Sequence, residues 1–399
     1  MNGKLMRATH ILPFGRRHIV PRICVAENKP HVRGFLAQAF EDLGFVTREC
    51  LRVDIPATLA EFTPDIVVIG PQGNESELAL LLQSVAQQEH GGKVMLFGGR
   101  SSLTLIAAQD FGEKLGLAML PPLGTPFRDG DLTANLAEYL PILPLPSIAV
   151  EAGEALEGGW IEPWYQSVID ARNLVPRGAA AVIRLRHPSW GVVPPASFVA
   201  EPGDPQLARL SQLIVVRVLA DWDSFIAVSP IGLSLALPLS ALLAEDFIDE
   251  LFLALSDRAL LSGLTIEVAA DEAARDPLGF RRVADALAAC RIRTGLTEVR
   301  GVHLPFLQDA EGAVRQIKLD RTMAEHATRD RRSREACGKI VALARAAKTA
   351  IAADGIDTRA ELQMARDLGV DALQGGLLAK PVDARRFLSV VNRQKPRPH

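Results

Sequence analysis

The stretch "RGAAAVIRLRHPSWG", residues 177–191, decides the fold of the larger part of this chain. Its apolar residues 180–183 predict a buried strand, and the charged segment with Pro188 that follows predicts a turn. A buried strand that runs into charged side chains is typical of the edge at which an α/β protein forms its active site. No carboxylate precedes Arg184, so the strand has the surroundings of a catalytic strand without a residue that could carry out a reaction.

Further apolar runs of strand length follow along the chain, and most of them are separated by segments with the spacing of amphipathic helices, such as residues 246–261 and 333–347. The seven runs are residues 179–185, 233–239, 264–270, 292–296, 313–320, 348–354 and 371–376. Seven or eight β-α units across about 235 residues match the size of one (β/α)8 barrel. Since the functional side chains of such barrels lie at the carboxyl ends of the strands, we expect this chain's site there.

The first third of the chain alternates in the same way. Five strand-like runs with interleaved helical segments span residues 20–141 and predict a three-layer, doubly wound α/β domain with a parallel sheet. The sequence "PILPLPS", residues 141–147, favours an extended connector because its prolines cannot continue a helix. The predicted organisation is a tail over 1–19, the α/β domain over 20–141, a linker over 142–158, the barrel over 159–392 and a tail over 393–399.

Charge and cysteine content argue against several classes of function. The 399 residues carry a net charge of −3, which favours neither a nucleic-acid partner nor an anionic membrane. The apolar runs are too short for a membrane span, so we expect a cytoplasmic protein. The four cysteines, Cys24, Cys50, Cys290 and Cys337, lie far apart without a C-x-x-C pair. This spacing argues against a structural zinc site or a disulfide framework and favours reduced thiols.

The stretches "ICVAENKPHVRGFLAQAFEDLGF", residues 23–45, and "PDIVVIGP", residues 64–71, resemble the receiver domain of response regulators, and the resemblance covers about 120 residues. In that family an acidic pair holds magnesium and an Asp after the third strand accepts a phosphoryl group. The matching positions here are the pair Glu27-Asn28, the acceptor position Gly70 and the hydroxyl position Gly98. No lysine occurs between residues 114 and 318. The resemblance implies a receiver-like domain that is not phosphorylated, in which Glu27 is a surface carboxylate.

Residues 178–188 follow the pattern Gly, hydrophobic, Glu-Ala-Leu, hydrophobic, Arg, and then Arg-His-Pro, with Ala180 in place of the glutamate. Further matches are "PPASFV" with Pro195 and Phe198, "IKLD" at 317–320 and "QGGLLAKP" at 374–381. On these motifs, residues 160–391 resemble the EAL family of cyclic di-GMP phosphodiesterases. The resemblance implies an EAL-type (β/α)8 barrel that has lost its signature glutamate.

The resemblance also implies which residues would form a vestigial pocket. They are Arg184, Glu267, Lys318, Asp320, Asp354 and Gln374. Positions at which the family has metal ligands are here Ala180, Pro238 and Thr297. Hydrolysis by this family is served by two metal ions about 4 Å apart, which need several carboxylates, so we expect no metal, no cofactor and no phosphodiesterase activity. Glu267, Asp320 and Asp354 either hold one magnesium or manganese ion or form an ion-pair network with Lys318.

Together these observations predict a non-enzymatic bacterial signalling regulator that acts through a protein partner. Both resembled families often form dimers, which makes a homodimer one possible assembly, and the sequence does not settle the oligomeric state. A second hypothesis is a cyclic di-GMP receptor that binds without hydrolysis through Arg184, whose planar guanidinium suits a phosphate. The competing interpretation of Arg184 is an ion pair with Glu267 or another barrel acid. A third hypothesis is a residual phosphodiesterase. His187 and His303 have no nucleophile and acid at a recognisable spacing, which favours ordinary turn or core histidines.

Overall fold

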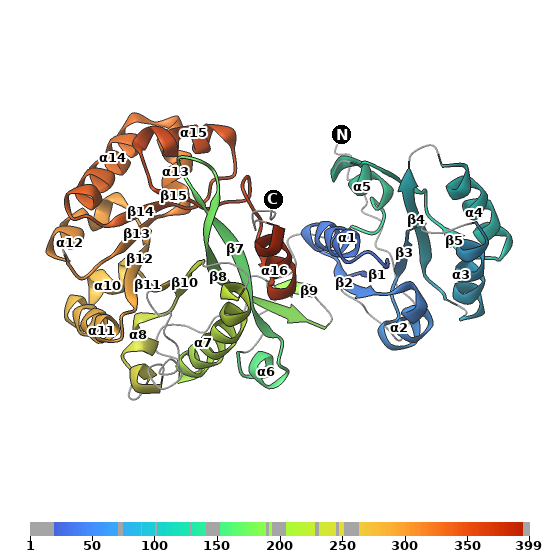
Figure 1. The fold of residues 1–399 in the computed structure, drawn as a ribbon, viewed down its shortest axis with the longest axis horizontal. Helices are drawn as coiled ribbons and strands as arrows, with labels where there is room; N and C mark the ends of the chain where they lie inside the picture. Colours follow the sequence, from blue (N-terminus) through green and yellow to red (C-terminus); the bar gives the residue numbers. More distant parts are fainter. Residues whose placement is uncertain are drawn as a thin grey trace, which may run out of the picture. The chain divides into compact units, whose positions relative to one another are not determined.

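The computed structural model describes residues 20–70, 75–88, 90–99, 102–127, 129–140, 152–188, 191–193, 205–227, 231–244, 247–250, 263–310 and 312–393. The chain divides into two compact units (Figure 1), one formed by residues 1–148 and 186–193 and the other by residues 149–185 and 194–399. Several predicted features lie outside the described residues: Pro195, Phe198, both tails apart from Arg393, most of the linker and most of the helix over 246–261.

The first unit is built on a parallel sheet with the strand order β2-β1-β3-β4-β5. Its strands are β1 (Arg22–Ala26), β2 (Val46–Cys50), β3 (Ile66–Ile69), β4 (Lys93–Gly99) and β5 (Ala118–Met119), and a short β6 (Leu123–Thr125) also pairs with β4. Its helices are α1 (Pro30–Asp42), α2 (Ile55–Phe62), α3 (Glu75–Gln87), α4 (Leu103–Lys114) and α5 (Asp129–Asn135). The order is one of the two common doubly wound orders, in agreement with the predicted α/β class.

Both faces of this sheet are covered by helices, and β3 shows why its strands are recognisable in the sequence. Ile66 and Val68 pack in the core under α1 and α5, whereas Val67 and Ile69 pack in the core under α2, α3 and α4. Because successive side chains of a strand point to opposite faces, a strand that is covered on both faces is apolar throughout. Figure 1 shows α1 and α5 on one side of the sheet and α3 and α4 on the other.

In the second unit, eight strands close into a barrel in the order β7-β8-β10-β11-β12-β13-β14-β15, and β15 pairs back with β7. The strands are β7 (Ile161–Asp170), β8 (Pro176–His187), β10 (Gly232–Ala236), β11 (Leu264–Ala269), β12 (Arg293–Val299), β13 (Gln316–Leu319), β14 (Ala350–Ala353) and β15 (Ala372–Leu373). Pairing from β8 through β15 is parallel, which confirms the predicted barrel. A short strand, β16 (Val382–Asp383), extends the sheet beside β7.

Strand β7 is absent from the seven predicted strands, and it runs antiparallel to both of its neighbours. A tight turn joins it to β8, in which Asp170 Oδ1 accepts hydrogen bonds from the backbone N–H groups of Arg172 and Asn173 at 2.9 and 3.2 Å. Leu174 completes the turn with a φ of 58°. The predicted series of strands misses β7, because the chain forms a hairpin here and not a β-α unit.

Helices surround the barrel strands as an outer layer (Figure 1). They are α6 (Ala152–Glu157), α7 (Pro205–Ile226), α8 (Leu239–Leu242), α10 (Ala270–Arg275), α11 (Pro277–Ala289), α12 (Leu304–Asp309), α13 (Arg321–Arg329), α14 (Arg331–Ala346), α15 (Arg359–Leu368) and α16 (Ala384–Arg393). Within the part of the chain that the structure describes, no helix has both the length and the apolar content needed to cross a bilayer.

Candidate functional site

The parallel register of the barrel places the candidate residues on one face in successive layers. Ala180 on β8 is in register with Ser234 on β10, which is in register with Thr265 on β11. Glu267 lies two residues further along β11, on the same face and nearer to the carboxyl end. The position at which the resembled family has its signature glutamate therefore lies one layer below Glu267, and only the methyl group of Ala180 is present there.

A buried ion pair lies on this face between β11 and β13. Lys318 Nζ donates to Glu267 Oε2 at 2.7 Å, and the two side chains are only 6% and 3% exposed. Gln316 Nε2 donates to the other oxygen of Glu267 at 2.8 Å. Both carboxylate oxygens are therefore engaged by protein donors. Of the two predicted roles for Glu267, this geometry supports the ion pair with Lys318.

Asp354 follows β14 and lies close enough to the ion pair to be affected by its charges. Burial raises the pKa of Asp354, while the positive charge of Lys318 and the backbone N–H of Gly355 act in the opposite direction. That N–H donates to Asp354 Oδ1 at 2.7 Å. Asp354 therefore holds a proton more readily than an exposed aspartate does.

Glu298 is a carboxylate at the same end of the barrel that the sequence analysis did not select. The register of β12 against β13 shifts between Leu296 and Val299, and Glu298 has a φ of 57°, which is strained for a residue with a Cβ. Burial raises its pKa, and the nearby charges of Asp320 and Asp271 raise it further. The sequence offered one reason to select Glu298: it follows Thr297, and this dipeptide corresponds to the Asp-Asp pair of the EAL family.

Asp320 acts as the N-cap of α13. Its Oδ1 accepts from the backbone N–H of Thr322 at 2.8 Å and from the Thr322 hydroxyl at 2.5 Å. Asp320, Glu298 and Asp354 thus have different surroundings, and the structure does not bring Asp320 into the ion pair of Glu267. The predicted network of three acids around Lys318 is therefore found only in part.

Arg184 lies near the carboxyl end of β8, in register with Glu162 of β7. Its Nη1 donates to the carbonyl oxygen of Ile183 at 3.0 Å. It forms no ion pair with any carboxylate of the described residues, and Glu267 is engaged by Lys318 instead. Burial lowers the pKa of Arg184, which shows that its surroundings disfavour an uncompensated positive charge.

Two buried polar groups inside the barrel have no hydrogen-bond partner among the described residues. Gln374 donates through Nε2 to Gln166 Oε1 at 2.7 Å, but its own Oε1 accepts nothing. The hydroxyl of Ser234, in register with Ala180, has no partner either. Buried polar groups are rarely left without a partner, so both atoms are unusual for the interior of a barrel.

A third polar cluster fixes the segment after β12. His303 is buried, and its Nδ1 accepts from the backbone N–H of Arg300 at 3.0 Å, so its Nε2 carries the proton toward Asp271 Oδ1 at 2.9 Å. The Arg300 guanidinium contacts the other oxygen of Asp271. The hydrogen bond with His303, followed by the charge of Arg300, lowers the pKa of Asp271. His303 is thus a core histidine, as predicted, and it anchors the turn beside Glu298.

The carboxylates of the barrel do not fit a pair of metal ions. Within the described ranges, no three His, Cys, Asp or Glu side chains converge in a way that could hold a metal. Glu267 is engaged through both oxygens, and neither Ala180 nor Pro238 offers a side-chain donor. Pro238 instead precedes α8 as its N-cap residue. No step that depends on a bound metal follows from this arrangement.

The first unit has a comparable acidic position at the carboxyl end of β1. Glu27 Oε2 contacts Arg52 Nη2 at 3.1 Å, and both side chains are buried, so the prediction of a surface carboxylate is wrong. The cause is the turn after β2, which brings the guanidinium of Arg52 over the strand end. A Cβ placed on Gly70 would lie 2.3 Å from Glu27 Oε2 and 2.4 Å from Phe97 Cζ. The position expected for a phosphoryl acceptor therefore has no room for a side chain.

Comparison with known proteins bears on the second unit. Residues 149–381 match the family model described as the EAL domain. The cyclic di-GMP phosphodiesterase PdeL of Escherichia coli (strain K12) is 27% identical over 59% of this chain and 66% of its own length. The cyclic di-GMP phosphodiesterase RocR of Pseudomonas aeruginosa is 27% identical over 69% of this chain and 74% of its own length. Among solved structures, the EAL enzyme Bd1971 in its cAMP- and cyclic-di-GMP-bound form superposes with a TM-score of 0.55 at 20% identity, covering 60% of this chain and 66% of that one, which supports the fold.

These relatives contradict the predicted function. Both sequence relatives are named as phosphodiesterases, and nothing in the comparisons points to a regulator that works through a protein partner without chemistry. The receptor hypothesis gains no better support from them. The error came from inferring the function of the whole protein from positions that had changed, such as Ala180. The names of relatives do not report on this chain's own site, so the expected loss of activity stays a prediction.

Proposed function

We propose, from the premise that this chain belongs to the EAL domain family, that cyclic di-GMP binds at the carboxyl mouth of its barrel. The names of PdeL and RocR make this nucleotide the first candidate ligand. The mouth is also where barrels of this architecture bind their ligands, because the strand ends and the loops after them converge there. The proposal concerns recognition, and its chemistry is tested separately below.

Arg184 is the observation that carries this proposal. A half-buried guanidinium without a carboxylate partner among the described residues is unfavourable, because burial removes water without supplying a counter-charge. A phosphodiester group would supply that charge, and the planar guanidinium can bind two of its oxygens at once. In a protein without such a ligand, an apolar residue at this position of β8 would be more stable.

The surrounding acids are compatible with an anionic ligand. Burial raises the pKa of both Asp354 and Glu298, so each of these groups holds a proton more readily than an exposed carboxylate does. Glu267 is neutralised by Lys318. The unsatisfied Oε1 of Gln374 offers an acceptor for a base or ribose donor. Among the described residues, the site thus combines Arg184, which has no carboxylate partner, with acids whose pKa is raised.

Isothermal titration of the full chain with cyclic di-GMP tests the proposal. We expect saturable binding that Arg184→Ala weakens by about tenfold or more, the size of a lost charge-assisted hydrogen bond. The matched control is Arg177→Ala, which removes an arginine at the opposite end of β8 that lies 3.8 Å from Asp170. This control should leave the affinity within about twofold. Absence of binding at high micromolar ligand, or equal loss in both variants, would contradict the proposed site.

Catalysis is measured in the same samples. The predicted inactivity rests on the engaged oxygens of Glu267 and on Ala180, which supplies no donor. We expect no linear dinucleotide from cyclic di-GMP in magnesium or manganese buffer. The control for contamination is Asp320→Asn, because Asp320 is one of the acids that a hydrolase of this family would use. Turnover by the wild-type chain that Asp320→Asn abolishes would establish a phosphodiesterase.

For the first unit we propose a receiver-like domain that does not accept a phosphoryl group. Its strand order supports the receiver-like assignment, and the crowded Gly70 and the buried Glu27–Arg52 pair support the loss of phosphorylation. Incubation with acetyl phosphate and magnesium, followed by intact-mass measurement, should show no phosphorylated protein. A phosphoryl adduct on any residue between 20 and 141 would contradict this assignment.

A further inference from the structure

Two of the four cysteines, distant in sequence, meet inside the first unit. The Sγ atoms of Cys24 and Cys50 are 3.4 Å apart, and both are free thiols. The register explains the contact: Ala26 is opposite Cys50 in the parallel β1–β2 pair, and Cys24 lies two residues earlier on the same face. The two thiols pack in the core beneath α2, α3 and α4.

We propose that Cys24 and Cys50 form a peroxide-oxidisable dithiol that closes to a reversible disulfide between β1 and β2. A disulfide has an S–S length of about 2.05 Å, so the two sulfur atoms need to approach by about 1.4 Å. Because Cys24 and Cys50 lie diagonally across the β1–β2 pair, closing the disulfide also needs a local shift of the two strands. The inference depends only on the first unit and is independent of the nucleotide site proposed above.

The surroundings make the two thiols unequal. Hydrogen bonds from the Cys24 thiol and the Thr58 hydroxyl lower the pKa of Cys50, and the charge of Arg33 acts in the same direction. The hydrogen bond to Cys50, together with burial, raises the pKa of Cys24. Because the thiolate is the nucleophile, Cys50 is the thiol that reacts first and Cys24 is the one that resolves the product.

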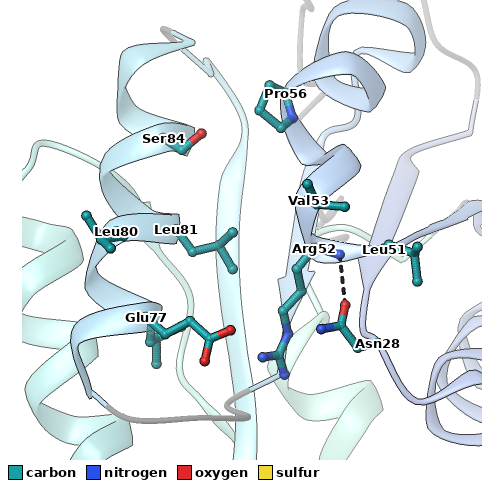
Figure 2. A pocket seen from close by; sticks show the side chains of 10 residues that line it. Asn28, Leu51, Arg52, Val53, Pro56, Glu77, Leu80, Leu81 and Ser84 are labelled. Atoms are coloured by element: carbon teal, nitrogen blue, oxygen red, sulfur yellow. Dashed lines mark hydrogen bonds between the residues drawn. The ribbon is translucent and has the colours of Figure 1, made fainter.

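Cys50 is also the more exposed of the two thiols. It is 9% exposed, whereas Cys24 is fully buried. The next residues, Leu51 and Arg52, line a groove of about 500 Å³ between the segment that begins α2 and helix α3. Figure 2 shows this groove, with Leu81 of α3 facing Arg52 and a hydrogen bond from the Arg52 backbone N–H to Asn28. Cys50 is the last residue of β2 and directly precedes the two residues that line this groove.

The chemistry balances with one hydrogen peroxide for each pair. The Cys50 thiolate attacks one peroxide oxygen, an S–O bond forms, the O–O bond breaks, and the hydroxide that leaves is protonated to water. The Cys24 sulfur then attacks the Cys50 sulfenic acid, so that the S–S bond forms as the S–O bond breaks. The released hydroxide combines with the Cys24 proton as a second water. The two sulfurs are together oxidised by two electrons, and the peroxide is reduced by two.

The experiment treats the full reduced chain with a small excess of hydrogen peroxide, blocks the remaining thiols under denaturing conditions and maps tryptic peptides. Trypsin releases Cys24 in residues 23–33 and Cys50 in residues 49–52, so a disulfide joins two distinct peptides. We expect this joined product, lighter than the two reduced peptides by about 2 Da and cleaved by dithiothreitol. Cys290 is the internal control because it is also 9% exposed but donates to the Ala286 carbonyl instead of a second thiol.

Cys50 should be oxidised at least about tenfold faster than Cys290, whose pKa burial raises. In Cys24→Ser, Cys50 should accumulate as a sulfenic acid that dimedone traps, while Cys290→Ser should behave as the wild type. Oxidation of Cys50 no faster than Cys290, or a wild-type chain in which both Cys24 and Cys50 are still blocked as thiols, would overturn the proposal. If Cys24→Ser does not fold, the wild-type peptide map decides the question alone.

Discussion

Both units contain a buried ion pair, but the surroundings of the two pairs differ. Each holds a buried carboxylate near the carboxyl end of a strand. The cation that neutralises it comes from the turn after the neighbouring strand in the first unit and from the next strand but one in the barrel. The pairs are Glu27–Arg52 at 3.1 Å in the first unit and Glu267–Lys318 at 2.7 Å in the barrel. Burial of either acid without its partner would be costly, so both pairs are structural whatever else they do.

The difference lies in what surrounds each pair. In the first unit, Glu27 and Phe97 fill the space beside Gly70, and no room is left for a side chain there. In the barrel, Asp354 has a raised pKa, and Arg184 has no ion-pair partner among the described carboxylates. The buried ion pair of the first unit is therefore surrounded by tightly packed side chains. The barrel, in contrast, keeps polar groups at its mouth that a ligand can satisfy.

The largest expected effect tests whether the barrel pair is structural. Lys318→Met leaves Glu267 buried without a cation and should lower the free energy of unfolding by about 3–5 kcal/mol. Urea denaturation followed by tryptophan fluorescence measures this, because three of the four tryptophans, Trp160, Trp164 and Trp222, belong to the second unit. The double variant Glu267→Leu with Lys318→Met should recover much of the loss, because no unpaired charge is then buried. Equal destabilisation in the single and double variants would show that packing, and not charge, explains the cost.

A smaller effect tests whether the first unit is closed at Gly70. Gly70→Ala places a methyl group against Glu27 and Phe97 and should destabilise this unit by about 1–3 kcal/mol, a typical cost of overpacking. Gly99→Ala is the matched control, because a Cβ there meets no atom within 4 Å, and it should change stability by about 0.5 kcal/mol or less. Circular dichroism during thermal unfolding compares the two. If Gly70→Ala left the stability unchanged, the space beside Gly70 would be open and the contrast between the two units would be contradicted.

The smallest effect concerns the acids at the barrel mouth. The pKa of Asp354 is raised in the folded protein by burial, so its contribution to stability is fully present below the unfolded-state pKa and is lost as the pH rises through the folded pKa. Asp354→Asn removes the ionisation and should make the protein more stable than the wild type at neutral pH. That gain should shrink as the pH falls below the ordinary range of aspartate. Denaturant titrations across this range measure it, with the exposed Asp367→Asn as the control, and a pH-independent difference would contradict the assignment.

Much of the fold follows from local patterns in the sequence. Apolar runs such as residues 66–69 predict strands, because a strand with two covered faces has no polar positions. The hairpin between β7 and β8 escaped prediction because its turn differs from the β-α alternation and depends on local hydrogen bonds around Asp170. Periodicity identifies an element but does not indicate in which direction it pairs.

The candidate site was predicted less completely than the fold. Arg184, Glu267, Lys318 and Asp354 were selected as pocket residues, and the structure shows which of them interact. Glu298 was overlooked, because its strained backbone and raised pKa arise from a register shift that no local pattern reveals. Its only sequence signal was its place after Thr297.

The sequence by itself determined what each position can supply: Ala180 and Gly70 have no oxygen donor, and no folding can provide one. Only the tertiary structure decided which groups meet. Lys318 reaches Glu267 across 51 residues, and Cys24 reaches Cys50 across 26, because strand register sets these contacts. A single residue determines which chemical groups its position offers. The arrangement of strands that are distant in sequence determines which of these groups lie close enough to neutralise a charge or to pair as thiols.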